Sequence, residues 1–377
     1  MTESKLKLSP IAAFNMSVTI RIENDLSVIL ISWIFGLAGI IANMVLLKFL
    51  NSPTLQRVRA IISRSIYRQE QLLRFNQTVK PTKTTINRTF TILLINLAGS
   101  DLLGSMYLII IASADLHHRL AHDKHNQTHF TDSSVSYLNW ISNPFCYIAR
   151  FINCVSIFQS AYIMMLVAID RYISVAYPFS AILKLTQRRA KFLCLLGWLI
   201  AMSVGTTFTV AAYITFPPAP APSYDYHNLC SFEDYADYEV RLLVLLFLII
   251  GILVYTVILV VYAGIYYKIR QRSISIHPNH KFGSKRAEWK ILKIAMIIVS
   301  TNFFFWFPGF ICGIVAYIYH PIFLVNNLFR NAATNSLLLF QINCVLNPIT
   351  LITFTTELNL CHSCRLLGNC KNNHSYK

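Results

Sequence analysis

Seven long runs of apolar residues follow one another along the 377-residue chain, separated by polar and charged segments. Each run exceeds the ~18 residues that an α-helix needs to cross the hydrocarbon core of a membrane. The pattern therefore predicts an all-α membrane protein, a bundle of seven transmembrane helices. We expect these helices at about residues 27–50, 90–114, 144–169, 191–215, 240–267, 291–318 and 322–354.

Composition and charge support membrane insertion and set the orientation. Hydrophobic residues make up 55% of the chain and charged residues 13%, too few charges to cover a soluble protein of this length. With the N-terminus outside, 25 of the 33 lysines and arginines fall on the inner side, as the positive-inside rule requires. The formal charge of +17 then indicates a basic cytoplasmic face that meets anionic membrane lipids and an acidic partner, and it argues against nucleic-acid binding.

The same pattern divides the chain into three parts. These are an extracellular tail (1–26), a seven-helix domain (27–354) and a cytoplasmic tail (355–377). No short, positively flanked apolar stretch with a small-residue cleavage site precedes the first span, so we expect that span to act as its own insertion signal. Sequons for N-glycosylation on the outer side begin at Asn15 and Asn126.

Three connecting segments carry further patterns. The outer segment 115–143 is polar and rich in histidine, and we expect a loop there. In the outer segment after the fourth span, residues 224–239 mix tyrosine with acidic residues, which favours either a surface for a basic peptide or a merely solvated loop. The inner segment 51–89 spaces apolar residues along one helical face among arginines, which predicts a basic amphipathic helix on the inner leaflet. Disorder or an error in the gene model is the alternative explanation for this segment.

Cysteines fall into groups by compartment. Cys146 begins the third span on the outer side and Cys230 lies in the next outer loop, so a disulfide between them would tie that loop over the mouth of the bundle. Two unpaired thiols are the alternative. Cysteines just after the last span are typical of S-palmitoylation; they are Cys361, Cys364 and Cys370. Their spacing with His362 and His374 makes a zinc site the alternative there.

Five polar residues lie inside the spans at similar depth: Asn43, Asp101, Ser160, Asn343 and Asn347. Polar groups are costly in hydrocarbon, so we expect them to face the bundle interior and to gather around the one carboxylate. Burial alone would drive Asp101 to protonate. A hard cation such as Na⁺, with Asp101, Ser160, Asn343 and Asn347 as oxygen ligands, would keep the carboxylate ionised. A protonated Asp101 in a hydrogen-bonded network without metal is the alternative.

Prolines inside the sixth and seventh spans predict hinges. Pro308 and Pro348 each remove a backbone donor and kink the helix that carries them. Trp306, two residues before Pro308, is placed either at the floor of an outward cavity or simply in the core.

An acid and a base stand side by side at the inner end of the third span, Asp170 and Arg171. The guanidinium could pair with Asp170 or with Glu288 at the start of the sixth span, and a pair across two helices would act as a latch. The alternative is that the two residues only mark the membrane interface.

Taken in order, these residues resemble the rhodopsin-like (class A) G-protein-coupled receptors over roughly residues 28–366. The resemblance rests on the order of the following positions: Asn43, the LAGSD run ending at Asp101, Cys146, Asp170-Arg171-Tyr172, Trp198, Tyr262, the FWFP run at 305–308 and Asn347-Pro348. Each position is weak evidence alone, whereas their order across seven spans is highly specific.

The resemblance implies roles for these residues. Arg171 would exchange its ion partners in the membrane for the C-terminal helix of a G protein, with Asp170, Tyr172, Tyr262 and Glu288 around it. It also implies a sodium site and activation network, formed by Asn43, Asp101, Ser160, Asn302, Trp306, Asn343, Asn347 and Pro348. A plasma-membrane location, a short amphipathic helix 8 and a heterotrimeric G protein as partner are implied as well, with arrestin and a receptor kinase as further candidate partners.

Finer detail is similar to one branch, the membrane module of the leucine-rich-repeat receptors for glycoprotein hormones and relaxin. The DLLGSMYLIIIASADLHHR run (101–119) and the LNW run before Cys146 carry this similarity. Val254 stands where most class A receptors have a proline that this branch lacks. Asn302 occupies a site that is acidic in this branch and is poised towards Asn347.

Two departures separate the chain from this branch. The N-terminal tail contains no leucine-rich repeats, so binding of a large hormone by an ectodomain cannot be carried over. Leu351 replaces the tyrosine that steadies the active state of the family through Tyr262 and the arginine, which puts ordinary activation in doubt.

The resemblance also narrows the ligand class. Gln341 replaces the retinal-binding lysine of opsins, and Asn153 replaces the aspartate of amine receptors, so the resemblance leaves a peptide or protein ligand as the default expectation. The candidate pocket residues are Arg150, Asn153, Trp306 and Phe310.

The sequence thus predicts a receptor that carries an extracellular signal to G proteins by outward movement of its sixth helix. A non-signalling decoy or trafficking partner is the first alternative, because of Leu351 and the missing repeats. A transporter or channel is the second, although the chain lacks the paired broken helices of related repeats. We expect no enzyme activity, because no nucleophile–base pair or metal triad lies in the interior, and no cofactor beyond an allosteric Na⁺.

Overall fold

The computed structural model describes seven ranges of the chain, 21–52, 85–125, 143–177, 182–215, 229–230, 238–274 and 282–318, together with residues 332, 335–336 and 338–353. Within these residues the long elements are all helices: α2 (Arg21–Leu50), α4 (Thr85–His125), α6 (Pro144–Ala176), α7 (Gln187–Thr215), α8 (Tyr238–Ile274) and α9 (Phe282–Ile318). A seventh, shorter apolar helix spans Leu338–Thr353, and the other six are long and apolar enough to cross a membrane. The prediction of an all-α bundle of seven transmembrane helices is confirmed.

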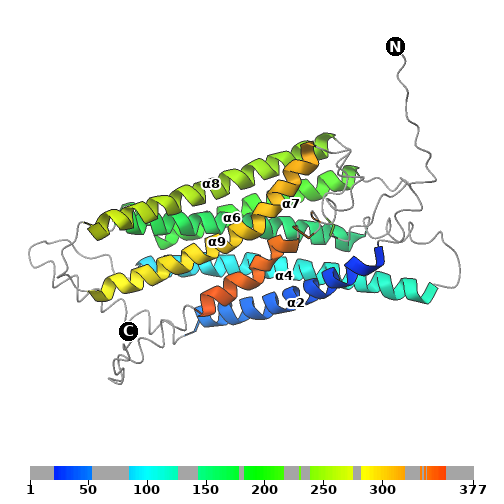
Figure 1. The fold of residues 1–377 in the computed structure, drawn as a ribbon, viewed down its shortest axis with the longest axis horizontal. Helices are drawn as coiled ribbons and strands as arrows, with labels where there is room; N and C mark the ends of the chain where they lie inside the picture. The colour runs from blue at the N-terminus through cyan, green and yellow to red at the C-terminus, as the bar shows by residue number, and fades with distance from the viewer. Residues whose placement is uncertain are drawn as a thin grey trace, which may run out of the picture.

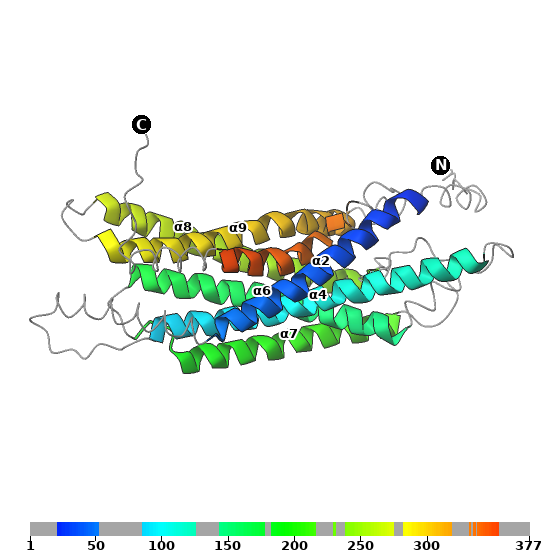
Figure 2. The same cartoon turned by 90° about the horizontal axis from the view of Figure 1, so that it is seen from below.

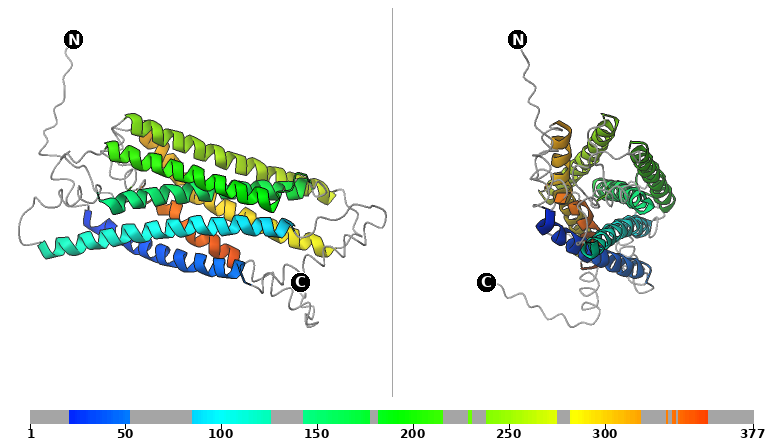
Figure 3. Two further views of the ribbon diagram at one scale, coloured as in Figure 1. Left: turned by 180° about the vertical axis from the view of Figure 1, so that it is seen from behind. Right: turned by 90° about the vertical axis from the view of Figure 1, so that its right-hand side faces the viewer.

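The helices lie side by side along one axis (Figures 1 and 2). Seen along that axis in Figure 3, they gather around α6, which contacts α4, α7, α8 and α9. Figure 1 also shows the ribbon of α9 changing direction along its length. Pro308 lies inside this helix, so the missing backbone donor explains a bend that does not break it. The central α6 therefore has contact with most of the bundle, and changes at its inner end can reach several helices.

The helices extend beyond the apolar runs that predicted them. The prediction of a loop from residue 115 is wrong up to His125, because α4 continues that far. Likewise α2 begins at Arg21, so the last residues of the predicted tail 1–26 are helical. The apolar run marks the part of a helix that lies in hydrocarbon, whereas the helix itself can continue into the polar residues that flank the run.

Sequence signals fix the starts of two helices. At the start of α6, the side chain of Asn143 accepts a hydrogen bond from the backbone N–H of Phe145 at 2.9 Å, and Pro144 occupies the first helical position. Before α7, the hydroxyl of Thr186 accepts a hydrogen bond from the N–H of Arg189 at 3.3 Å. These caps set where the chain enters the bundle at the outer end of α6 and at the inner end of α7.

Buried apolar side chains form two clusters. The larger one, here the inner cluster, includes Leu46, Leu97, Met164 and Ile258, and it reaches the aromatic side chains around Trp306. The smaller one, here the outer cluster, includes Tyr107, Ile111, Cys146, Leu229, Cys230 and Leu338. Many large aliphatic side chains of α2, α7 and α8 are exposed instead, which suits helices whose outer faces meet lipid.

Several predicted features lie outside the described residues. These are the sequons at Asn15 and Asn126, most of the inner segment 51–89, most of the acidic segment 224–239, helix 8 and the candidate palmitoylation sites Cys361, Cys364 and Cys370. They remain predictions.

Candidate functional site

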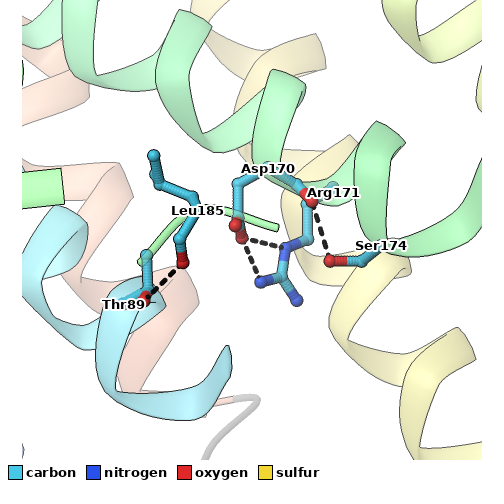
Figure 4. Close-up of polar contacts among 5 residues, drawn as sticks. All are labelled: Thr89, Asp170, Arg171, Ser174 and Leu185. Atoms are coloured by element: carbon cyan, nitrogen blue, oxygen red, sulfur yellow. Dashed lines mark hydrogen bonds and ion pairs between the residues drawn. The ribbon is translucent and has the colours of Figure 1, made fainter. Parts of the chain in front are cut away.

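The inner end of α6 carries a buried charged pair. The residue Arg171 is 7% exposed, and its guanidinium donates two hydrogen bonds to one carboxylate oxygen of Asp170, the Nε bond measuring 3.2 Å. Ser174, one turn later, donates to the backbone carbonyl of Asp170 at 2.8 Å. Figure 4 shows that the pair lies beside the first turns of α4. Arg171 is therefore held inside the bundle rather than extended into lipid.

The side chains of α4 complete this inner site. The ring of Phe90 lies under the Arg171 guanidinium, 4.6 Å from the ring centroid to the Cζ atom. The hydroxyl of the preceding residue, Thr89, donates to the carbonyl of Leu185 at 3.1 Å, which ties α4 to the segment before α7 (Figure 4). Sequence reasoning missed both residues.

Three more residues were predicted to surround Arg171. The structure describes the side chains of Tyr172 and Tyr262 but not that of Glu288. Tyr172 packs edge to face against Tyr177, with the ring centroids 6.4 Å apart. Tyr262 of α8 is buried, and its hydroxyl has no hydrogen-bond partner among the described residues. Glu288 lies in α9, but its side chain is not part of what the structure describes, so its pairing with Arg171 stays a prediction.

A chain of hydrogen bonds links four helices around Asp101. Asn302 of α9 donates to the side-chain oxygen of Asn347 at 2.9 Å, and Asn347 donates to one carboxylate oxygen of Asp101 at 3.0 Å. Ser160 of α6 donates to the other carboxylate oxygen at 3.4 Å. Asp101 is 1% exposed, so these bonds replace the water that the carboxylate gives up. Of the five polar residues expected to gather around one carboxylate, Asp101, Ser160 and Asn347 do so.

The other two of the five predicted polar residues are Asn43 and Asn343. Asn43 donates to the backbone carbonyls of Gly39 and Cys344, at 2.9 and 2.8 Å, and so joins α2 to the seventh helix. Both amide atoms of Asn343 are buried without a hydrogen-bond partner in the described part of the chain. Among the described residues, the hydrogen bonds to the Asp101 carboxylate come from Ser160 and Asn347, and not from these two asparagines.

The donor set fits a small hard cation in part. Asp101 and Ser160 offer oxygen atoms at one buried place, and Asn343, one helical turn before Asn347, has a buried side-chain oxygen without a partner among the described residues. Asn347, in contrast, presents its nitrogen to Asp101, because its oxygen accepts from Asn302. Asp101, Ser160 and Asn343 are thus the better candidates for holding Na⁺, and Asn347 is a hydrogen-bond donor to the carboxylate.

An aromatic layer fills the bundle above this network. Trp306 is 3% exposed, and its ring centroid lies 5.2 Å from Tyr255, 6.0 Å from Phe310 and 5.1 Å from Phe340. Phe310 is buried in the same layer. Both candidate pocket residues from α9 are therefore core side chains in this arrangement.

The outer end of the bundle is closed by a disulfide. Cys146 and Cys230 are bonded, with their Cα atoms 5.5 Å apart, so the predicted pairing is confirmed. The buried Arg150 donates from Nε to the carbonyl of Cys230 at 3.0 Å, and Tyr107 donates to the carbonyl of Leu229 at 2.7 Å. Cys230 has a positive φ of 46°, which an L-residue adopts only where its surroundings impose it. Three separate attachments hold this piece of the outer loop.

Next to this closure, polar side chains join α6 to the seventh helix. Gln341 donates from its side-chain nitrogen to the side-chain oxygen of Asn153. Gly104 of α4 leaves room for the pair, because a Cβ there would lie 2.7 Å from the hydroxyl of Ser156 and closer still to Gln341 and Cys344. Asn153, predicted as a ligand contact, thus has an internal partner that the sequence did not indicate.

Leu351 packs where the family tyrosine was expected. It is 1% exposed and belongs to the inner cluster. The position therefore adds apolar contact to the inner cluster in place of the hydroxyl of a tyrosine.

Comparison with known proteins agrees with this geometry. The family of seven-transmembrane receptors of the rhodopsin type matches residues 78–350. Similar relatives are the follicle-stimulating hormone receptors of Felis catus and Sus scrofa, each 26% identical over 263 residues, which are 70% of this chain and 33% of the relative. That of Rattus norvegicus is 26% identical over 283 residues, 74% of this chain and 36% of the relative, so the chain spans about a third of the length of these proteins. With its seven helices, its buried arginine and its disulfide, the chain belongs to the rhodopsin family of seven-transmembrane receptors, multi-pass proteins of the plasma membrane that are not enzymes.

Proposed function

We propose that the chain carries the signal of an extracellular protein or peptide ligand to heterotrimeric G proteins. The observation that supports this most is the buried guanidinium of Arg171, held at the inner end of the central helix by contacts that can exchange. The relatives named above are receptors for a protein hormone, which supports a ligand of that class. Only a ligand that binds the open arrangement better than the closed one can shift the equilibrium between them.

The resting contacts suggest how the inner end opens. The inner half of α9 swings outward about the bend at Pro308. Asn302 then leaves Asn347, and the chain of bonds around Asp101 rearranges. Arg171 leaves Asp170 and turns towards the C-terminal helix of the G protein. Asp101 and Ser160, with Asn343 as a further candidate ligand, would hold Na⁺, whose charge would offset that of the carboxylate.

Ligand-free nucleotide exchange tests this proposal without knowledge of the ligand. Wild type, Asp170→Asn, Glu288→Ala and Arg171→Ala are purified in lipid nanodiscs, and exchange is measured on heterotrimers of each Gα class per folded receptor. We expect Asp170→Asn and Glu288→Ala to raise exchange, because they release the arginine, and Arg171→Ala to reduce it to the rate without receptor. Equal exchange for all four proteins would contradict the proposal.

The buried Leu351 favours a second candidate, a seven-helix protein that does not signal. Leu351→Tyr separates the two functions. If the wild type is silent and Leu351→Tyr gains exchange, the chain is a decoy or a trafficking partner that lost coupling at this position. If both proteins exchange nucleotide, the receptor function stands. A transporter or channel would instead show ion flux in vesicles that contain the purified protein.

A further inference from the structure

The contacts of Arg171 differ in what they connect. Its bonds to Asp170 join neighbouring residues of α6, so they move with that helix and tie it to nothing else. Among the side chains that the structure describes, Asp170 is its ion-pair partner. Among the described residues, a direct contact of the guanidinium with another helix is the ring of Phe90 in α4, whose centroid lies 4.6 Å from the guanidinium carbon (Figure 4 shows the neighbouring Thr89).

The geometry points to Phe90 as a positioning residue. We propose that its ring face holds Arg171 across the α4–α6 boundary in the resting state, so that release of the arginine requires breaking a cation–π contact. This inference rests on the proposed function, because it assigns a resting restraint to the arginine that would receive the G protein. The attraction is strongest where the cation is shielded from water, and here the Arg171 side chain is 9% exposed.

The turn of α4 that contains Phe90 is also hydrogen-bonded to the segment before α7. Thr89 donates to Leu185 at 3.1 Å, and Leu185 lies two residues before α7 begins. Phe90 is only partly buried, yet it packs against the inner cluster, so apolar neighbours help to fix its ring. A restraint of this kind keeps the ring in place beneath Arg171 whether or not a carboxylate of α9 is near.

Phe90→Leu removes the π face and keeps an apolar side chain, whereas Phe90→Tyr and Phe90→Trp keep the face. We expect Phe90→Leu to raise ligand-free nucleotide exchange about tenfold, and Phe90→Tyr and Phe90→Trp to behave like the wild type. Phe49→Leu is the matched control, since it shortens another partly buried ring of the inner cluster. Two outcomes would overturn the inference and leave Phe90 as a packing residue. One is an equal rise of nucleotide exchange in Phe90→Leu and Phe49→Leu; the other is a rise in Phe90→Tyr and Phe90→Trp as large as that in Phe90→Leu.

A second measurement reads the contact without a G protein. With ¹⁵N-labelled arginine, the guanidinium resonance of Arg171 is assigned by its loss in Arg171→Lys. The ring current of Phe90 shields these nuclei, so we expect the resonance to move downfield in Phe90→Leu and to stay in Phe90→Tyr. If it moves while no variant of the chain promotes exchange, the restraint is supported and the proposed function fails. If it does not move, the inference fails whatever the exchange rates are.

Discussion

The contacts that hold the two ends of the bundle together differ in kind. At the outer end, a disulfide, an arginine and a tyrosine all attach to the two loop residues Leu229 and Cys230. At the inner end, Arg171 is held by a neighbouring carboxylate and an aromatic ring, and Thr89 holds Leu185 by one hydrogen bond. A covalent bond persists through any rearrangement of the helices, whereas ion pairs, ring contacts and single hydrogen bonds exchange partners.

This difference suggests a division of labour. A bundle fixed at its outer end transmits a change of shape to the end that is free to move, so the attachments at Leu229 and Cys230 should act mainly on stability. The contacts of Arg171 and Thr89 should act mainly on the equilibrium between closed and open arrangements. The comparison fails if mutations at the two ends change stability and nucleotide exchange in the same proportion.

The largest effect is expected from the disulfide. Cys146→Ser, Cys230→Ser and the double variant should lose about 2–5 kcal/mol of unfolding free energy, because the cross-link restricts the unfolded chain. Thermal unfolding of the purified protein in nanodiscs measures the loss, and the double variant should match either single one. Cys312→Ser is the control, since Cys312 is a free cysteine. Unfolding of the double variant at the wild-type temperature would show that the outer end is held without the bond.

Arg150→Ala should have the next largest effect. The substitution leaves the buried carbonyl of Cys230 without its charged donor, a loss of about 1.5–3 kcal/mol. The same substitution in the Cys146→Ser background should cost less, because a loop freed from the disulfide no longer presents its carbonyl to Arg150. Thermal unfolding of the four proteins gives the coupling. If Arg150 serves only as a ligand contact, Arg150→Ala will unfold like the wild type.

The sequence predicted the parts of this molecule that are costly in a membrane. Asp101, Asn347 and Arg171 stood out because polar groups in hydrocarbon need partners, and the structure places all three in the interior with partners. The disulfide was predicted from the compartment of two cysteines. The turn of Asn302 towards Asn347 was expected from the family resemblance, and it is confirmed at 2.9 Å.

The rest could not be predicted because its residues look ordinary in an apolar run. Phe90 is one aromatic residue among many, and only the rotation of α4 against α6 brings its ring under a guanidinium. The pairing of Gln341 with Asn153 likewise depends on the register of two helices distant in sequence. Helix ends were missed for another reason, since hydropathy reports the membrane rather than the end of a helix, as the extension of α4 to His125 shows.

A smaller effect is expected from Tyr107→Phe. This change removes one hydroxyl that donates to the carbonyl of Leu229 at 2.7 Å, and it keeps the ring in the outer cluster. The unfolding free energy should fall by about 1 kcal/mol, the usual net value of one hydrogen bond. Ligand-free nucleotide exchange should stay at the wild-type rate, because the disulfide still holds the loop. A clear rise in exchange would mean that the outer attachments also control the switch.

Thr89→Val is the matching change at the inner end and should have the smallest effect on stability. It too removes one hydroxyl that donates to a loop carbonyl, that of Leu185 at 3.1 Å, and valine has nearly the same shape as threonine. We expect a loss of about 1 kcal/mol or less in thermal unfolding. Ligand-free exchange should nevertheless rise above that of Tyr107→Phe, because Thr89 stands next to Phe90 and lies in the turn that holds Arg171. The two variants thus remove the same kind of bond at opposite ends, and only a difference in exchange at similar stability supports a fixed outer end and a switching inner end.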